Sequence, residues 1–527
     1  MKKLLLYITC IVLCLIGAKL KAQETFPAEK VIMWTDRALF VCGEQIQFAG
    51  EVHIQEEQEI FSQVVYIELI TPNNQKINQI KLPIHQSYFE GRISIPIDIL
   101  SGYYYLRAYT KWMRNGNPED YEYHLIKIIN PYHSQVVSEQ DTSIIVPEKL
   151  EIETYDIPSY QEGDSIILPP DFYKMQLDHK SIAIIPDETA AFQTNKSSKT
   201  KPFYDQIQYY PETRGLSISG KILLNDQYSA YHKMNVHVLG KKDFIDVLCD
   251  SFGNFNVALP QAYQDQELFL IAAMNHQGKV SIQIDQDFCT KEMLLPSPAF
   301  KLEEGEEEIF LKMAKNQQIK QTFFKEENSK LIKDTILPFY GAVFKTIKID
   351  FYVPLDSLEQ YFTDIPSWVV VKKKKKKRYL QLLGSQADLT LYPALVLVDW
   401  VPVDDAERVL AMNPSLIEKI DIINQSYIHG NEIYGGIIHI QTYKGDFGDL
   451  KFPESGQYLN YKFYSTHSNG SSIPYTFNNT PLWKTQVPNV QDLHIQTPPL
   501  PGKYLIILQG INQQGKLKRL IQKIQVK

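Results

Sequence analysis

Cysteine is scarce in this chain of 527 residues, which contains only five, two of them within its first fourteen residues. The other three are Cys42, Cys249 and Cys289, and they lie far apart in the sequence. Disulfide-rich small domains and thiolate metal sites both require closely spaced cysteines. The sequence therefore excludes a disulfide framework and predicts three small, buried hydrophobic residues.

Spaced catalytic and metal-binding motifs are also missing. The twelve histidines form no His-x-x-x-His or His-Glu-x-x-His pattern. No Gly-x-Ser-x-Gly motif or phosphate-cradling loop occurs either. We predict no catalytic residue, no cofactor-binding residue, no metal ligand and no cofactor, and we expect a non-enzymatic binding protein. A hydrolase with an unrecognised site is a further alternative.

Long hydrophobic runs are limited to the beginning of the chain. Two lysines at residues 2–3 precede an apolar run over 4–18, and Ala22 offers a cleavage point. At about fifteen residues the run is short for a membrane span, so we predict a signal peptide over 1–22 and no transmembrane segment in the mature chain. A retained anchor is the alternative. Cys10 and Cys14 lack the preceding small residues typical of lipoproteins, which favours ordinary cleavage.

An excess of positive charge is absent. The formal net charge is −7, and loss of the four lysines before residue 23 takes it to about −11. A mildly acidic chain argues against a dedicated nucleic-acid binder. The exception is a run of six lysines, 372–377, followed by Arg378. It could bind an anionic surface, but we favour a solvated strand edge that discourages pairing with other chains.

The residues that are plentiful favour β-structure. The chain has 32 tyrosines and 25 phenylalanines, and its 29 prolines outnumber its 25 glycines. Short alternating strands with turn residues every 8–15 positions are typical of antiparallel sandwiches. We predict a mainly β-protein with several immunoglobulin- or macroglobulin-like β-sandwich domains and one small α/β domain.

Two sandwich segments resemble known domains. The segments "WTDRALFVCGEQIQFAGEV" and "ILSGYYYLRAYTKWMRN" resemble the second repeat of macroglobulin-type β-sandwiches, over about residues 28–131. The segment "DSFGNF", residues 250–255, resembles the hairpin of carboxypeptidase-regulatory-like domains. Gly253 would supply the turn position with positive φ.

Residues 392–446 carry the most informative pattern. They predict a strand over 394–398, a turn over 399–402, a helix over about 406–412, and strands over 417–423 and 437–442. Every segment resembles the plug domain of TonB-dependent outer-membrane receptors. The positions that match its motif, to which we assign structural roles, are Asp399, Pro402, Tyr434, Gly435 and Gly436. Trp400 stands where that family prefers glycine. A 22-stranded barrel needs several hundred residues, and fewer than 85 follow Gly445, so we expect a plug-like unit without a barrel.

These segments predict seven consecutive parts. They are a signal peptide (1–22), a macroglobulin-type sandwich (23–131), a second sandwich (132–210), a regulatory-like sandwich (211–287), a partly helical connector (288–365), a plug-like α/β domain (366–448) and a C-terminal sandwich (449–527). The chain thus resembles exported multidomain envelope proteins that combine these modules without a barrel.

Two chemical interpretations compete with structural ones. Cys42-Gly43-Glu44-Gln45 is the sequence of the macroglobulin internal thioester, but here it occupies a sandwich turn and continues into a strand, so we predict no thioester. Asp399, Asp404 and Asp405 cluster as in calcium sites, yet they lack the alternating oxygen ligands of a calcium loop. Turn-forming and helix-capping roles are favoured for them.

From these observations we expect a binding or scaffolding protein of the bacterial periplasm or outer membrane. The resemblance implies a protein partner at the outer membrane, such as a transport or secretion component, with no nucleic acid and no small-molecule cofactor. The alternative is a macroglobulin-like protease trap or envelope-defence protein, which would require a reactive thioester.

Overall fold

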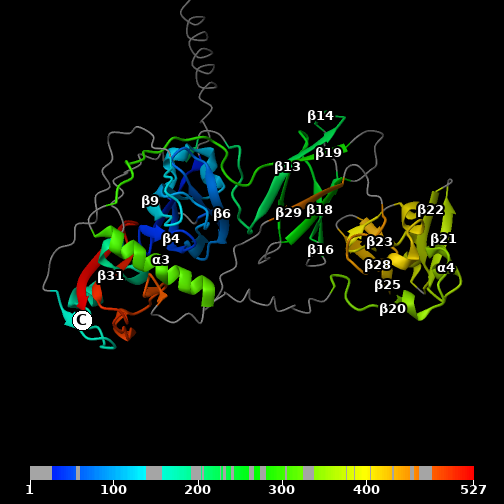
Figure 1. The fold of residues 1–527 in the computed structure, drawn as a ribbon. Coiled ribbons are helices and arrows are strands. Elements are labelled where there is room, and N and C mark those ends of the chain that lie inside the picture. Colours follow the sequence, from blue (N-terminus) through cyan, green and yellow to red (C-terminus); the bar gives the residue numbers. More distant parts are fainter. Residues whose placement is uncertain are drawn as a thin grey trace, which may run out of the picture. The chain divides into compact units, whose positions relative to one another are not determined.

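The computed structural model describes most of the chain beyond residue 25. The described ranges are 26–54, 60–137, 157–190, 203–204, 207–225, 227–228, 233–238, 243–259, 266–272, 280–302, 305–323, 338–374, 377–384, 386–403, 405–429, 432–450, 456–461 and 477–527. The predicted signal peptide lies outside them. None of the helices in these ranges is both long and apolar enough to cross a membrane. The protein is mainly β, as the sequence predicts, and its elements fall into two compact units (Figure 1).

The first unit comprises Met1–Leu216, Gln286–Ser329 and Tyr464–Lys527. Its amino-terminal part is a β-sandwich of a three-stranded and a five-stranded sheet. The first sheet contains, in order, β2 (Glu29–Thr35), β4 (Gln45–Ile54) and β7 (Tyr88–Ser94). The second contains β3 (Leu39–Val41), β9 (Glu122–Ile129), β8 (Gly102–Tyr109), β5 (Val64–Ile70) and β6 (Lys76–Pro83). Short 3-10 helices η1 (Trp112–Asn115) and η2 (Pro118–Asp120) follow β8, and β1 (Phe26–Pro27) pairs with β12 (Phe203–Tyr204).

Another five-stranded sheet of this unit combines segments that the sequence analysis placed in two separate sandwiches. Its strands are β10 (Ser159–Tyr160), β32 (Leu517–Val526), β31 (Gly502–Ile511), β11 (Asp178–Pro186) and β30 (Leu482–Lys484), with α2 (Pro170–Lys174), η3 (Asp187–Thr189) and η8 (Val490–Asp492) beside them. The apolar run Ile182–Ile185 of β11 pairs with 505–508 of β31. The apolar side chains of the two strands are therefore buried beside each other. Strands β10 and β11 of the segment 132–210 therefore share one sheet with β30, β31 and β32 of the segment 449–527.

Helix α3 (Glu306–Phe323) is the one long helix within the described residues, and it crosses the amino-terminal sandwich beside β3 (Figure 1). Its first turn is acidic, which suits the positive end of a helix dipole. The buried Glu306 carboxylate accepts a hydrogen bond of 2.5 Å from Lys127 Nζ, which also donates to Lys301 O. Phe310 and Met313 lie one turn apart, and their buried side chains hold the rest of the helix against the first unit.

The second unit comprises Ser217–Asp285 and Lys330–Phe463. Its first part contains two four-stranded sheets. One is formed by β13 (Ser217–Leu224), β14 (Gln227–Tyr228), β17 (Asn254–Ala258) and β19 (Val280–Ile284), the other by β16 (Asp243–Leu248), β15 (Lys233–Val238), β18 (Gln266–Ala272) and β29 (Gly456–Tyr461). The positive φ predicted for Gly253 is confirmed at +77°. Asp250 fixes this turn by accepting hydrogen bonds from the backbone N–H groups of Phe252 and Asn254, each 2.8 Å long.

The second part of this unit is an α/β domain. Its mixed five-stranded sheet has the order β20 (Lys345–Lys348), β25 (Ile417–Ile423), β28 (Ile437–Thr442), β23 (Leu395–Val398) and β24 (Val401–Pro402). Around it are α4 (Leu358–Thr363), α5 (Ala387–Leu391), α6 (Ala406–Leu410), η5 (Ile349–Phe351), η6 (Pro414–Leu416) and the hairpins β21 (Val369–Lys374)–β22 (Lys377–Leu382) and β26 (Tyr427–His429)–β27 (Glu432–Tyr434). β20 and α4 lie within 288–365, which the sequence analysis assigned to a connector. Strand β20 has only four residues, two of them lysines, so its sequence pattern is too short to indicate a strand.

Period-two alternation gives the α/β sheet two different faces. Ile420, Ile422, Ile438 and Ile440 face one side, where α4, α6 and the β21–β22 hairpin complete the main core. The opposite face holds a smaller cluster of Leu395, Leu397, Ile423 and Ile437, against which partly buried aromatic rings pack. The strands over 394–398, 417–423 and 437–442 and the helix near 406–412 agree with the elements predicted from the sequence.

Candidate functional site

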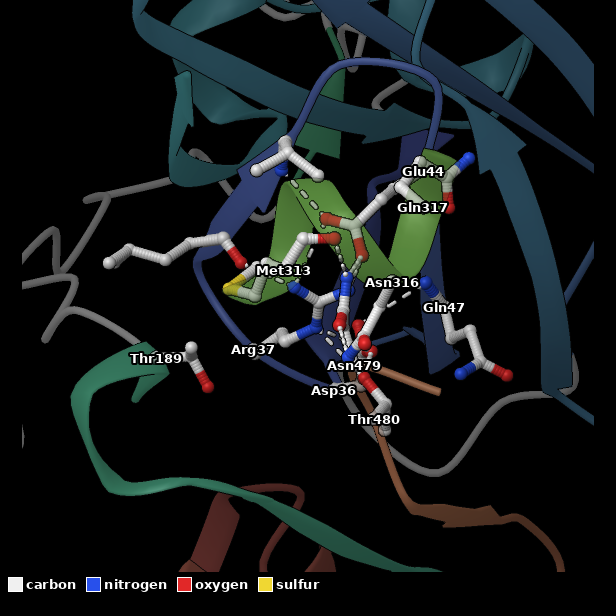
Figure 2. A network of polar contacts seen from close by, with 12 residues as sticks. Asp36, Arg37, Glu44, Gln47, Thr189, Met313, Asn316, Gln317, Asn479 and Thr480 are labelled. Atoms are coloured by element: carbon white, nitrogen blue, oxygen red, sulfur yellow. Dashed lines mark hydrogen bonds and ion pairs between the residues drawn. The ribbon is translucent and has the colours of Figure 1, made fainter. Parts of the chain in front are cut away.

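A cluster of buried charges in the first unit surrounds Arg37 (Figure 2). The loop between β2 and β3 carries Asp36 and Arg37, and the turn before β4 carries Glu44. The Arg37 guanidinium donates to both Glu44 carboxylate oxygens, at 2.7 and 3.3 Å, and to Leu39 O at 2.7 Å. It also lies over the Phe40 ring, 4.3 Å from the centroid. Fork-like pairing of this kind fixes orientation as well as charge.

Side chains from far along the chain complete this cluster, which we call the Arg37 network. Thr480 accepts from Arg37 Nε at 2.8 Å and donates to Asp36, while Asn479 donates to Glu44 Oε1 at 2.7 Å. The Asn479 amide also donates to Met313 O of α3 at 3.1 Å. In Figure 2 the loop that carries Asp36, the segment that carries Asn479 and Thr480, and helix α3 converge on the Arg37 guanidinium. The network therefore ties the sandwich, α3 and the segment before β30 together within the first unit.

A cleft of roughly 190 Å³ adjoins the network and shares Met313, Asn316 and Asn479 with it. Its remaining walls come from the first turns of α3, the start of η3, the segment before β30 and the residues around the beginning of β31. They are Pro186, Glu188, Gly305, Glu308, Ile309, Lys312, Asn478, Pro481, Leu500, Pro501, Gly502, Lys503 and Tyr504. The lining combines polar side chains and charges of both signs with apolar groups. We take this cleft as the candidate functional site.

Burial changes the protonation of Asp36. Two carboxylates share one guanidinium in the Arg37 network, and Asp36 is almost completely removed from water. Desolvation, opposed by the neighbouring Arg37 charge, raises the pKa of Asp36 to about 6. The pKa of Arg37 is raised by the Glu44 and Asp36 charges despite burial, so the guanidinium stays protonated.

This pKa predicts a pH dependence of stability. Because the Asp36 pKa is near 6 when folded and 3.8 when exposed, its contribution is full below about pH 4 and is lost as pH rises through 6. We expect wild-type protein to lose up to about 3 kcal/mol relative to Asp36→Asn over that window. Urea unfolding of both proteins across the window measures this difference. If the free energy of unfolding changed with pH in the same way for both proteins, the raised pKa assigned to Asp36 would be contradicted.

The turn containing the thioester-like sequence is part of the same region. Cys42 is buried, burial raises the pKa of its thiol to about 11, and Gly43 has φ +80°. Gln45 lies in β4 opposite Ser94. Gln317 of α3 donates its side-chain amide to Gly43 O. The run therefore serves as a strand-connecting turn covered by a helix.

We accordingly expect methylamine to release no thiol. An intact thioester would hide Cys42 until a nucleophile opened it, whereas in the structure Cys42, Cys249 and Cys289 are thiols outside any disulfide. Titration with a thiol reagent in denaturant, before and after methylamine treatment, should give three thiols per chain from residue 23 onwards in both samples. An additional thiol after treatment would establish the protease-trap alternative.

The five plug-motif positions lie at opposite ends of the parallel pair β23–β28. Tyr434, Gly435 and Gly436 precede β28; Gly436 has φ +88°, and Gly435 N donates to Pro393 O at 2.9 Å. At the other end, buried Asp399 accepts from Thr442 N at 2.8 Å, Thr442 Oγ1 at 2.5 Å and Phe447 N at 2.9 Å. Pro402 pairs with Leu397. These contacts shape turns, and the structure does not bring the five residues together.

The other charged positions noted in the sequence also have structural contacts. Asp405 caps α6 by accepting from Glu407 N at 3.0 Å, and Asp404 lies outside the described residues. Within the described ranges, no group of three His, Cys, Asp or Glu side chains is placed to hold a metal ion. The described lysines of the run, 372–374 and 377, lie in β21 and β22, and Arg378 of β22 pairs with Glu359 and Glu407.

Sequence reasoning missed the partners of the Arg37 network. Asp36, Arg37 and Glu44 stand inside the macroglobulin-like "TDR…GE" motif, which marks them as polar residues of a structural turn. Asn479 and Thr480 follow the segment "IPYTFN", which carries no periodic signal that connects it with residue 37. The cleft residues on α3 share an i, i+3, i+4 pattern, but only the structure shows which surface faces them.

Comparison with known proteins gives weak structural likenesses. No protein-family model matches the chain, and no curated protein matches it. Methylamine-reacted alpha-2-macroglobulin from Salmonella matches with 10% identity and a TM-score of 0.17, covering 95% of this chain and 24% of that one. Elastase-activated alpha-2-macroglobulin from Escherichia coli matches with 8% identity and a TM-score of 0.21, covering 95% and 44%. Dimeric latent PorU from Porphyromonas gingivalis matches with 8% identity and a TM-score of 0.15, covering 95% of this chain and 34% of that one. The chain thus spans about a quarter of the Salmonella protein, and its weak structural neighbours include bacterial alpha-2-macroglobulins.

Proposed function

We propose that this chain is a non-enzymatic binding or scaffolding protein of the bacterial envelope, in the periplasm or associated with the outer membrane. In this proposal it docks an outer-membrane transport or secretion component through its β-rich surfaces. The signal-like amino terminus and the resemblance to macroglobulin-type and plug-like modules support an envelope location. The cleft beside the Arg37 network is the observation that supports binding most directly.

The cleft has the chemistry of a site for a protein segment. Ile309 and three prolines provide apolar contact surface, while Glu188, Glu308, Lys312 and Lys503 provide charges of both signs at its walls. A peptide segment offers apolar side chains, backbone hydrogen-bonding groups and charges in the same way. We therefore assign a protein partner to this cleft.

The walls of the cleft are held in place before any partner arrives. Asn316 donates to Asn479 Oδ1 at 2.9 Å, and Asn479 in turn donates to Glu44, which pairs with Arg37. Sites whose side chains are already fixed lose less conformational entropy on binding. In this proposal the buried charges of the network fix the wall shared by α3 and residues 478–481.

Affinity capture from bacterial envelopes tests the proposal. Tagged protein from residue 23 onwards is incubated with detergent-solubilised envelopes, and captured proteins are identified by mass spectrometry. We expect an outer-membrane component to be enriched with wild type and lost with Lys312→Glu/Lys503→Glu, because the double change reverses both positive charges of the cleft.

Lys516→Glu/Lys518→Glu is the matched control, since these exposed lysines lie near the β31–β32 turn and do not line the cleft. This variant should capture the same component as wild type. Recovery of no envelope component, under conditions that retain known complexes, would overturn the proposal. Equal loss of the captured component with both double variants would contradict the assignment of the binding site to the cleft.

A further inference from the structure

The cations of the α/β domain are concentrated in the β21–β22 hairpin. Residues 338–450 contain twelve Lys and Arg residues, and seven of these lie within 372–378. The rest of this range carries five Lys and Arg residues against fourteen Asp and Glu residues. The hairpin is therefore a basic element on an otherwise acidic domain.

Strand pairing places the lysines of the hairpin beyond its hydrophobic part. Val369 pairs with Leu382, and both side chains are buried in the main core. Further along the two strands, Lys372, Lys373 and Lys377 are all exposed. Because successive side chains alternate between the two faces, Lys372 and Lys377 share one face and Lys373 lies on the other. The hairpin thus presents positive charge to solvent on both of its faces.

Two carboxylates beside the hairpin are engaged by Arg378. Its guanidinium pairs with Glu359 at 2.7 Å and also with Glu407. Within the described residues, neither Lys372 nor Lys377 takes part in an ion pair. The charges of these two lysines are therefore left to solvent and to external anions.

Protection against strand pairing does not require so many charges. One charged side chain can interrupt pairing at an exposed strand edge. Seven consecutive cations repel one another, and runs of this length are common in interaction segments. An approaching anionic surface would relieve that repulsion.

The composition of the hairpin favours a membrane surface over a protein or nucleic acid. Protein–protein interfaces are depleted in lysine and rely on apolar anchors, whereas Val369, Leu380 and Leu382 of the hairpin face the domain core. Nucleic-acid-binding domains carry an excess of positive charge, whereas the rest of this domain is acidic. Lysines are flexible point charges that can adapt to a fluid layer of lipid phosphates.

We propose that Lys372, Lys373 and Lys377 of the β21–β22 hairpin attach the α/β domain to a membrane surface of anionic phospholipids. Because the rest of the domain is acidic, the hairpin meets this surface first and orients the domain on it. Each lysine near the surface adds to the affinity, and its contribution decays within a Debye length. The attachment is peripheral and reversible. This inference concerns the second unit and does not rest on the function proposed for the cleft of the first.

Vesicle flotation tests the inference on the chain from residue 23 onwards. The vesicles contain phosphatidylcholine alone or equal parts of phosphatidylcholine and phosphatidylglycerol. We expect the protein to float with the anionic vesicles and not with the neutral ones. Raising NaCl from about 0.05 M to about 0.5 M should weaken this binding about tenfold or more, because salt screens exposed charges.

Substitutions in the hairpin assign the binding to its lysines. Lys372→Gln/Lys373→Gln/Lys377→Gln should weaken binding to anionic vesicles about tenfold or more, because three charges are removed. The corresponding triple arginine variant keeps the charges and should bind within a few-fold of wild type. Since all three side chains are exposed, both variants should fold.

Lys484→Gln/Lys516→Gln/Lys518→Gln is the matched control, because it removes three exposed lysines from the first unit and should bind like wild type. If the triple glutamine variant of the hairpin fails to fold, Lys372→Gln/Lys377→Gln gives the same test without touching an ion pair of the described residues. Equal binding to neutral vesicles, unchanged affinity in the hairpin variants, or equal weakening in the control would overturn the inference. Tighter binding to duplex DNA or to polyglutamate than to anionic vesicles, at equal concentration of anionic groups, would also overturn it.

Discussion

Arg37→Met should lower the free energy of unfolding of the first unit by about 3–5 kcal/mol. The guanidinium is buried between Asp36 and Glu44, and its removal leaves two carboxylates without their cation. A buried charge that loses its partner is costly because water cannot replace the lost contact. Hydrogen exchange measured by mass spectrometry should also show faster exchange in α3, since the Arg37 network reaches Met313 O through Asn479.

The matched control for this change is Lys174→Met in α2. Lys174 and Asp171 form an ion pair 4.0 Å long, in which both side chains are about three-quarters exposed. Exposed pairs contribute little because water screens them, so the expected change is below about 0.5 kcal/mol. A loss under about 1 kcal/mol for Arg37→Met would contradict the structural role assigned to the network.

Gly435→Ala should destabilise the α/β domain by about 3 kcal/mol or more. A Cβ at this position would lie 2.3 Å from Tyr392 O and within 3.0 Å of two other backbone oxygens. Backbone atoms cannot move aside as a flexible side chain can, so the strand start at β28 would have to shift. Urea unfolding, with hydrogen exchange to assign the transition to this domain, measures the effect.

Gly341→Ala provides the comparison within the same unit. Gly341 has φ +73° but open space around it, so an added methyl group meets backbone strain without a clash. The expected cost is about 1 kcal/mol. Equal effects at the two glycines would mean that the close approach of the 388–392 backbone is not what requires glycine at position 435.

The α/β domain shows how much local sequence can predict. The β25 segment "IEKIDII" and the β28 segment "IIHIQT" place isoleucine at alternating positions on the core face, so their strands are evident from periodicity. The glycines before β28 indicate a turn, and Gly436 has the positive φ that such turns need. Short β20 was missed, because four residues carry little periodic information.

Long-range pairing is what the sequence could not supply. Strand β11 pairs with β31, although more than 300 residues separate Ile184 from its partner Ile506. Both strands have apolar runs that could complete many sheets, so their patterns do not specify each other. For the same reason Asp36, Arg37 and Glu44 were visible as a motif, whereas Asn479 and Thr480 were not linked to them. The candidate cleft depends on these pairings and was therefore not predictable.

Photocrosslinking in intact cells tests the central claim, that this chain binds an envelope protein through its cleft. A benzophenone amino acid replaces Lys503 at the cleft or, as control, exposed Gln514 in the β31–β32 turn. The proposal predicts a specific adduct with an outer-membrane or periplasmic protein from position 503 and none from position 514. No adduct from position 503, or an adduct with a cytoplasmic protein, would contradict it.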